Sequence, residues 1–150
     1  MSVGSDPSAV AFDGSHIWVA SSGTDTVSEI NVASATVVNT VTVETASQGV
    51  AFDGSHIWVS KHSSHSVSEI DVASHGVIKT VTVGSLQIGV TFDGSHIWVS
   101  KHSSHSVSEI DVASHSVIKT VTVGSHPIGV AFDGSHIWVA NANDNTLSIL

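Results

Sequence analysis

Apolar residues occur in short runs separated by turn residues, and this pattern recurs every 40 residues along the chain. The string Phe-Asp-Gly-Ser-His-Ile-Trp-Val begins at Phe12, Phe52, Phe92 and Phe132. The two inner copies are nearly identical, because residues 52–85 and 92–125 differ only at Gly76 and Ser116. A fixed period of this length is typical of repeat architectures. The near-identity indicates recent duplication or deliberate construction of the repeats.

Turn residues divide each repeat into four short apolar segments, which predict four antiparallel strands. In the third repeat these segments are 90–92, 97–99, 107–112 and 117–123, and Asp93-Gly94 is a strong hairpin signal between the first two. Four such strands in one repeat match a β-propeller blade. The sequence therefore predicts a single all-β domain over residues 1–150. Its blades are expected at about 10–43, 50–83, 90–123, and 130–150 together with 1–4.

The second strand of a repeat is apolar at consecutive positions, as in Ile97-Trp98-Val99. This pattern favours a sheet that is packed on both faces by neighbouring blades. We expect the recurring aromatic residues to fill those interfaces, although a ring of aromatics that stacks on a ligand is the alternative. They are Phe12, Trp18, Phe52, Trp58, Phe92, Trp98, Phe132 and Trp138. Lys79 and Lys119 in the fourth strand suit an outer edge, where lysine discourages pairing with other sheets.

The last repeat carries the motifs of a known family. Residues 127–134 read Pro-Ile-Gly-Val-Ala-Phe-Asp-Gly, residues 137–141 read Ile-Trp-Val-Ala-Asn, and residues 145–148 read Asn-Thr-Leu-Ser. In these motifs the chain resembles the YVTN family of propeller repeats, with YVTN/NHL-like blades over essentially its whole length. The resemblance implies the fold. It implies no catalytic site, because the motif residues are structural and the family serves several unrelated functions.

The two ends of the chain suggest how a ring closes. Residues 1–10 align with 41–50, and the last repeat stops after its third strand. The N-terminal stub Ser2-Val3 is therefore expected to pair beside Thr146–Leu150 and complete the last blade. One chain could close alone as a four-bladed ring, or two chains could close head to tail as an eight-bladed ring. An open arc is not expected, because it would expose two apolar blade faces.

The resemblance favours the dimer, because proteins with such repeats usually have more than four blades. The homodimer is thus the expected assembly, with the chain itself as its partner.

Composition limits the other partners. The chain has no arginine, four lysines and a formal charge of −9, which disfavours nucleic acid as a partner. Neither a signal peptide nor an apolar run long enough for a membrane helix is visible, so we expect a soluble chain of undetermined compartment. Eleven histidines make its charge sensitive to mild acid, and the absence of cysteine excludes a disulfide framework.

Histidines are the only unusual chemical signal. One set recurs in the Asp-Gly-Ser-His hairpin of every repeat, at His16, His56, His96 and His136. Strict recurrence favours a role in the turn or in packing. The alternative is a ring of imidazoles on one face that binds a metal or an anion.

A second set occurs only in the inner repeats, as His-Ser-Ser-His in the loop between the second and third strands. These residues are His62, His65, His102 and His105. Two such pairs on one rim could supply the four ligands that zinc prefers, but a hydrophilic loop copied by duplication is the favoured interpretation. His126 is expected on the same rim, and His75 and His115 on the opposite one.

These observations favour a non-enzymatic repeat protein that forms a propeller scaffold by self-association, with an amplified or engineered fragment as one origin. Near-identical blades argue against an enzyme, because active sites usually need different residues on different blades. Metal binding by the histidine rim is the first alternative. The second is a lyase, since similar propellers cleave cyclic peptide antibiotics with histidine, glutamate and magnesium. No catalytic residue of this chain is assigned on that resemblance.

Overall fold

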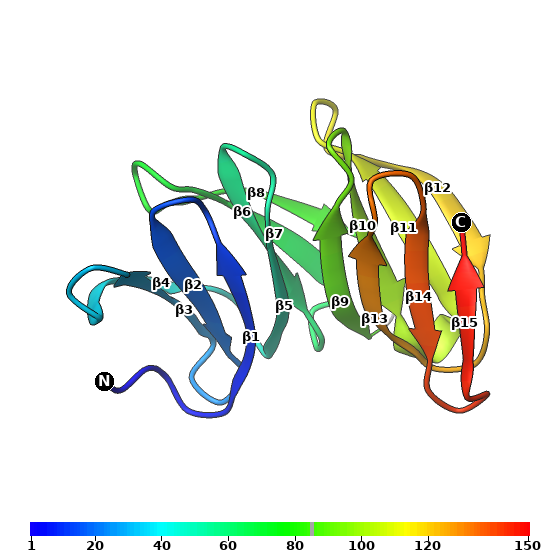
Figure 1. Cartoon of the computed structure of the whole chain (residues 1–150), viewed down its shortest axis with the longest axis horizontal. Helices are drawn as coiled ribbons and strands as arrows, with labels where there is room; N and C mark the ends of the chain where they lie inside the picture. The colour runs from blue at the N-terminus through cyan, green and yellow to red at the C-terminus, as the bar shows by residue number, and fades with distance from the viewer. Residues whose placement is uncertain (85) are drawn as a thin grey trace.

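A computed structural model describes residues 1–84 and 86–150 and shows four antiparallel sheets, one for each repeat (Figure 1). The first sheet contains β1 (Pro7–Phe12), β2 (His16–Ser21), β3 (Thr26–Asn31) and β4 (Thr36–Thr42). The second contains β5 (Ser47–Phe52), β6 (His56–Lys61), β7 (Ser66–Asp71) and β8 (Val77–Thr82). The third contains β9 (Gln87–Phe92), β10 (His96–Lys101), β11 (Ser106–Asp111) and β12 (Ser116–Thr122), with a 3₁₀ turn at His102–Ser104. The last contains β13 (Pro127–Phe132), β14 (Ile137–Asn141) and β15 (Thr146–Ile149).

Each sheet is a meander whose first strand lies innermost, and the prediction of four short antiparallel strands in each complete repeat is confirmed. The innermost strands of successive sheets contact each other in chain order, β1 with β5, β5 with β9, and β9 with β13. The sheets therefore stand side by side as blades around a common axis. No helix in the described ranges is long and apolar enough to cross a membrane.

The Asp-Gly turn fixes the first hairpin of every blade. In the first blade the Asp13 carboxylate accepts hydrogen bonds from the backbone N–H groups of Ser15 (2.7 Å) and His16 (2.6 Å). Gly14 has a φ of 102°, a backbone conformation that residues other than glycine rarely adopt. The same bonds recur in the other three blades. The same hydrogen-bonded turn therefore joins the first two strands in all four blades.

Neighbouring residues of the second strand point to opposite faces of each blade. In the third blade, Ile97 and Val99 pack on the second blade, whereas Trp98 packs on the last blade. We call the two sides the Phe face, which carries the phenylalanine of the repeat, and the Trp face, which carries the tryptophan. The predicted packing of both faces is thereby confirmed for the inner blades.

Every junction joins the Trp face of one blade to the Phe face of the next. At the first junction the Trp face supplies Trp18, Ala20, Val27, Val41 and Val43, and the Phe face supplies Val50, Phe52, Ile57, Val59 and Ile70. Equivalent residues form the second junction, and a smaller set forms the third. The core is thus three layers between blades rather than one central cluster.

The four blades form an open arc, with the first and last blades at its two ends and nearest the viewer in Figure 1. The last sheet has three strands, and Gly4 lies against Ser21 and Thr24 of the first blade instead of β15. Closure of a ring by the stub within one chain is therefore not met, whereas closure by a second chain stays a prediction. Apolar side chains fill each of the three junctions, and the four blades together span only part of a ring (Figure 1).

The layered core predicts a large contrast between two isoleucines. Ile57 is fully buried in the first junction, whereas Ile118 on the outermost strand β12 is exposed. Replacing Ile57 by Ala should lower the free energy of unfolding by about 2–5 kcal/mol, because it leaves a cavity. Ile118→Ala should lower the free energy of unfolding by less than about 1 kcal/mol, because this side chain is already exposed. Urea denaturation of both variants checks this, and equal losses would contradict the layered core.

Candidate functional site

A hydrogen bond from each tryptophan anchors the hairpin aspartate. The Trp18 Nε1–H donates to Asp13 Oδ2 at 2.7 Å, and the bond recurs in all four blades. Burial opposes ionisation of Asp13, but this bond and those from the backbone of His16 and Ser15 outweigh it and lower the pKa to about 2. Bonds from Trp138, His136 and Ser135 likewise lower the pKa of Asp133 to about 2. Asp13 and Asp133 are therefore held as carboxylates down to low pH.

A glutamate lies beside the hairpin in each of the first three blades, and Glu29 and Glu69 are buried. Glu29 pairs with Trp18 across β2 and β3, so both side chains are on the Trp face, and only 7% of the Glu29 side chain is exposed. The Nδ1 atom of His16 lies 3.4 Å from Glu29 Oε1 and 3.7 Å from Asp13 Oδ2. The ligand atoms of these three residues all lie within 4.8 Å of one another.

The next blade adds a second imidazole to this group. His75, in the turn between β7 and β8, places Nε2 2.8 Å from Glu29 Oε2, and its ring lies 6.2 Å from that of Trp18. At the second junction His115 places Nε2 2.7 Å from Glu69 Oε2 and stacks on Trp58. Glu29 and Glu69 thus each contact two imidazoles, one from the same blade and one from the next blade. We call the two sets the junction clusters; they comprise Asp13, His16, Glu29 and His75, and Asp53, His56, Glu69 and His115.

The clusters change towards the ends of the arc. Asp93, His96 and Glu109 form a third group of the same kind, and no histidine equivalent to His75 contacts Glu109 among the described residues. In the last blade Ile149 occupies the position of the glutamate, opposite Trp138. In the first blade Ala35 occupies the position of His75. Within the part of the chain that the structure describes, a glutamate with histidines from two blades therefore occurs only at the first two junctions.

A pocket of about 500 Å³ opens beside the second junction cluster. Asp53, His56, Glu69 and His115 all line it, together with apolar residues that include Phe92. Small ions and molecules in solvent can therefore reach this cluster. Sequence reasoning connected His16 and its equivalents with turns but did not combine them with Glu29, Glu69, His75 and His115. The recurrence of the glutamate every 40 residues was the available signal.

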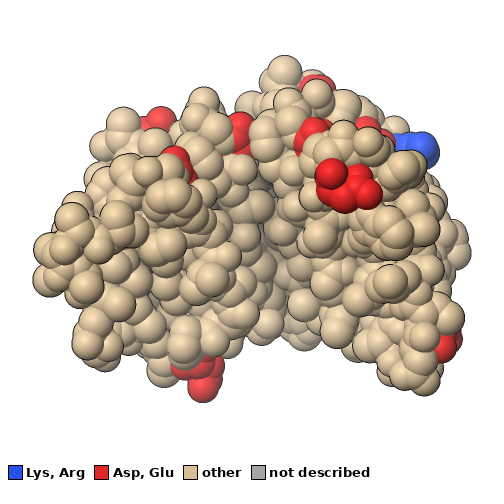
Figure 2. All heavy atoms as spheres, in the orientation of Figure 1, with Lys and Arg blue, Asp and Glu red and all other residues tan. Residues whose placement is uncertain are grey.

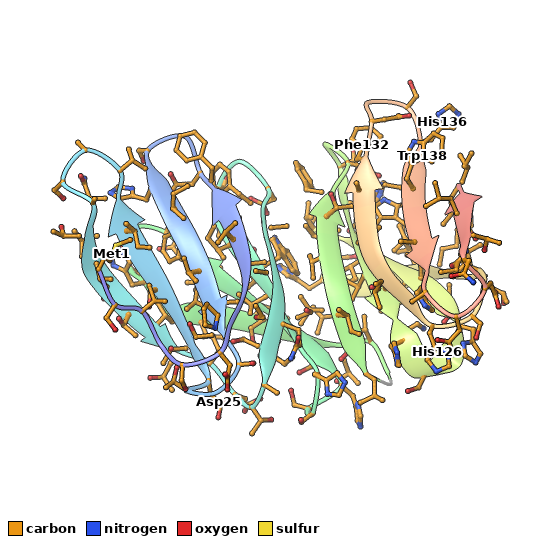
Figure 3. The ribbon with its side chains drawn as sticks, turned by 60° about the horizontal axis from the view of Figure 1, so that its bottom comes forward. Met1, Asp25, His126, Phe132, His136 and Trp138 are labelled. Atoms are coloured by element: carbon orange, nitrogen blue, oxygen red, sulfur yellow. The ribbon has the colours of Figure 1, made fainter. Side chains whose placement is uncertain are left out.

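The rim histidines lie at the opposite edge of the blades, where Figure 3 shows His126 far from His136. The ring of His126 lies 4.3 Å from that of His102 and 5.1 Å from that of His105. Burial lowers the pKa of His102, and the imidazoles of His126, His62 and His105 lower it further. These histidines thus gather on one rim, as the repeat spacing suggested.

Hydrogen bonds at this rim oppose its use as a zinc site. The Nδ1 atoms of His65 and His105 accept backbone N–H bonds from Leu86 (3.3 Å) and His126 (3.1 Å). A neutral imidazole that accepts at Nδ1 carries its proton on Nε2, so it has no free lone pair for a metal. Among residues 1–84 and 86–150, only the Asp-His-Glu sets bring three ligand atoms within 4.8 Å. Zinc binding by His62, His65, His102 and His105 stays a prediction.

Comparison with solved structures decides the architecture. The chain is similar to Kuenenia stuttgartiensis hydrazine synthase, with a TM-score of 0.85 and 20% identity over 99% of this chain and 47% of that one. It is also similar to U3-55K, with a TM-score of 0.81 and 14% identity over 100% of this chain and 53% of that one. A third similar structure is the Myxococcus xanthus glutaminyl cyclase, with a TM-score of 0.73 and 10% identity over 91% of this chain and 62% of that one. The chain has the β-propeller fold.

The propeller likeness shows the fold alone, and the chain spans about half the length of the first two structures. No protein-family profile and no curated protein sequence matches the chain, so membership of the YVTN family stays a prediction. Two of these similar structures are named as enzymes, and the propeller fold therefore does not decide whether this chain is one.

The anchored aspartates predict a loss of stability in acid. Because the folded pKa of Asp13 is below its ordinary 3.8, its ionisation stabilises the fold fully above about pH 4, and this contribution disappears as the pH falls towards about 2. The Asp13→Asn variant should be less stable than the parent chain at pH 5, and the difference should shrink towards pH 2. Urea midpoints across this range measure it.

Trp18→Phe is the matched variant for this prediction, because it removes the Nε1–H donor but keeps an aromatic ring in the junction. Its loss of stability relative to the parent chain should also shrink between pH 5 and pH 2, but by less than for Asp13→Asn. If the difference in stability between Asp13→Asn and the parent chain were the same at pH 5 and pH 2, the lowered pKa of Asp13 would be contradicted.

Proposed function

We propose that this chain is a non-enzymatic scaffold of which two copies associate head to tail to close an eight-bladed ring. The observation that carries the proposal is that the two ends of the arc present the two halves of one junction. The first blade presents an uncovered Phe face, and the last blade presents an uncovered Trp face. A second copy related by a two-fold rotation would cover both faces at once.

The Phe face of the first blade is exposed where its internal counterparts are covered. Phe12 is 56% exposed and Val10 is also exposed, whereas Val50, the counterpart of Val10 in the second blade, is buried in the first junction. Side chains selected for a junction thus lie in solvent in the single chain. Exposed apolar surface of this kind marks an association site.

The Trp face of the last blade shows the complementary exposure. Leu147 is 63% exposed, whereas Val107, its counterpart in the third blade, is fully buried. Trp138 is only partly covered, although Trp18 and Trp58 are fully buried. Charged side chains on the side viewed in Figure 2 gather near its upper and lower edges and leave the middle largely uncharged.

Two substitutions at the ends match each other. At an internal junction a glutamate on the Trp face meets a histidine from the next blade, as in Glu29 with His75. The last blade has Ile149 in place of the glutamate, and the first blade has Ala35 in place of the histidine. Head-to-tail closure would bring these two apolar residues together. Neither side would then leave a buried charge without its partner.

The N-terminal stub supports the same closure. Met1 and Val3 align with Val41 and Val43, which are buried on the Trp face of the first junction. In a dimer the stub of one copy would supply the short fourth strand of the other copy's last blade. The near-identity of the inner blades further favours a scaffold, because it repeats one environment instead of building a differentiated active site.

A charge on the end face should prevent the dimer. The 150-residue chain is expected at twice the monomer mass in native mass spectrometry, and Leu147→Asp should shift it to the monomer, because closure would bury the carboxylate. Ile118→Asp is the matched control on an exposed outer strand and should stay dimeric. A monomeric parent chain would overturn the proposal.

A rescue experiment tests the direction of closure. Ile149→Glu alone should weaken the dimer, and adding Ala35→His should restore it by recreating the internal pair of glutamate and histidine. The backbone permits this change, because φ is 52° at Ala35 and 58° and 55° at His75 and His115. Dissociation constants from sedimentation velocity measure the effect. Absence of rescue, with both variants folded, would contradict the head-to-tail arrangement.

A further inference from the structure

We propose that each junction cluster binds one divalent transition-metal ion of the zinc type and thereby links two adjacent blades. The ligands at the first junction are Asp13, His16 and Glu29 from one blade and His75 from the next. Asp53, His56, Glu69 and His115 form the second site. Both sites lie within one chain, so the proposal does not depend on ring closure.

The spacing of three ligand atoms at each junction fits zinc, and the histidine of the next blade is the nearest candidate for the fourth ligand. Bonds of about 2.0–2.1 Å in a tetrahedron place neighbouring ligand atoms about 3.3 Å apart. At the second junction His56 Nδ1 lies 3.2 Å from Glu69 Oε1 and 3.5 Å from Asp53 Oδ2. His115 Nε2 lies 2.7 Å from Glu69 Oε2, the other oxygen of this carboxylate, so the imidazole would have to turn towards Asp53 and His56 to become the fourth ligand.

The charges of the cluster favour a cation. Asp53 and Glu69 expose only 7% and 4% of their side chains, and two carboxylates this close repel each other. A divalent ion neutralises both while the two imidazoles stay neutral. A cation between the two carboxylates would therefore offset their repulsion.

Residues around the ligands hold them in place. The Trp58 Nε1–H and the backbone N–H groups of Ser55 and His56 fix the Asp53 carboxylate, and the Trp58 ring stacks on His115. Such outer contacts orient ligands in metal sites. The pocket of about 500 Å³ beside this cluster gives an ion a path from solvent.

The chain contains its own controls for this proposal. The group of Asp93, His96 and Glu109 lacks the histidine from the next blade, and the last blade has Ile149 instead of a glutamate. A four-ligand site should therefore form at two junctions only. The rim histidines offer a separate comparison on the opposite edge.

Titration with cobalt(II), a spectroscopic substitute for zinc, tests the proposal. The metal-free chain should bind two ions at micromolar concentration or below, with the intense visible absorption of tetrahedral cobalt, and zinc should displace them. The variant His75→Ala with His115→Ala should lose this absorption and both tight sites. Glu29→Gln with Glu69→Gln should do the same, and circular dichroism should show that both variants stay folded.

Two further variants separate the possible sites. His136→Ala should keep both ions, because the last blade has no complete cluster. Replacing His62, His65, His102 and His105 by Ser should also keep both. Loss of cobalt binding in this rim variant, with retention in the His75 and His115 variant, would overturn the proposal. Absence of tight binding by the folded parent chain would overturn it as well, leaving the clusters as hydrogen-bonded ion pairs.

Discussion

Packing of a Trp face against a Phe face is the interaction on which this structure depends. Because consecutive residues such as Ile57, Trp58 and Val59 point to opposite sides of a blade, each blade contributes to two junctions. The aspartate of the hairpin holds the tryptophan by its Nε1–H, so the turn and the junction are built from one motif. A blade at an end has only one covered face, and the stability of the end blades depends on what covers the other.

The sequence predicts the strands and the junctions well, because both arise from local patterns. The Asp-Gly turn marks a hairpin, and the continuous apolar run Ile97-Trp98-Val99 indicates burial on both faces. The placement of His126 beside His102 and His105 also follows from the alternation of turns along the meander. What could not be predicted is the angle between blades. That angle depends on how side chains of different sizes fit together, and it leaves a single chain as an open arc.

The junction clusters were missed for a related physical reason. His115 and Glu69 are 46 residues apart, and only the stacking of adjacent blades brings them together. Sequence spacing instead drew attention to His102 and His105, which are near neighbours in one loop. Their geometry is less suited to a metal, because His105 Nδ1 accepts a backbone hydrogen bond. A search for ligands in repeat proteins should therefore pair each position with positions one period away.

The exchange of Glu and His for Ile149 and Ala35 also affects how the chain folds. Inner blades that are almost identical in sequence could pair with the wrong neighbour, a characteristic failure of repeat proteins. If the first blade took the place of the third on the second blade, Glu69 would face Ala35 and lose the imidazole that partners it. Such a buried charge without a partner is costly. Ile149 and Ala35 thus distinguish the end blades from the inner ones and make arrangements in the wrong order less stable.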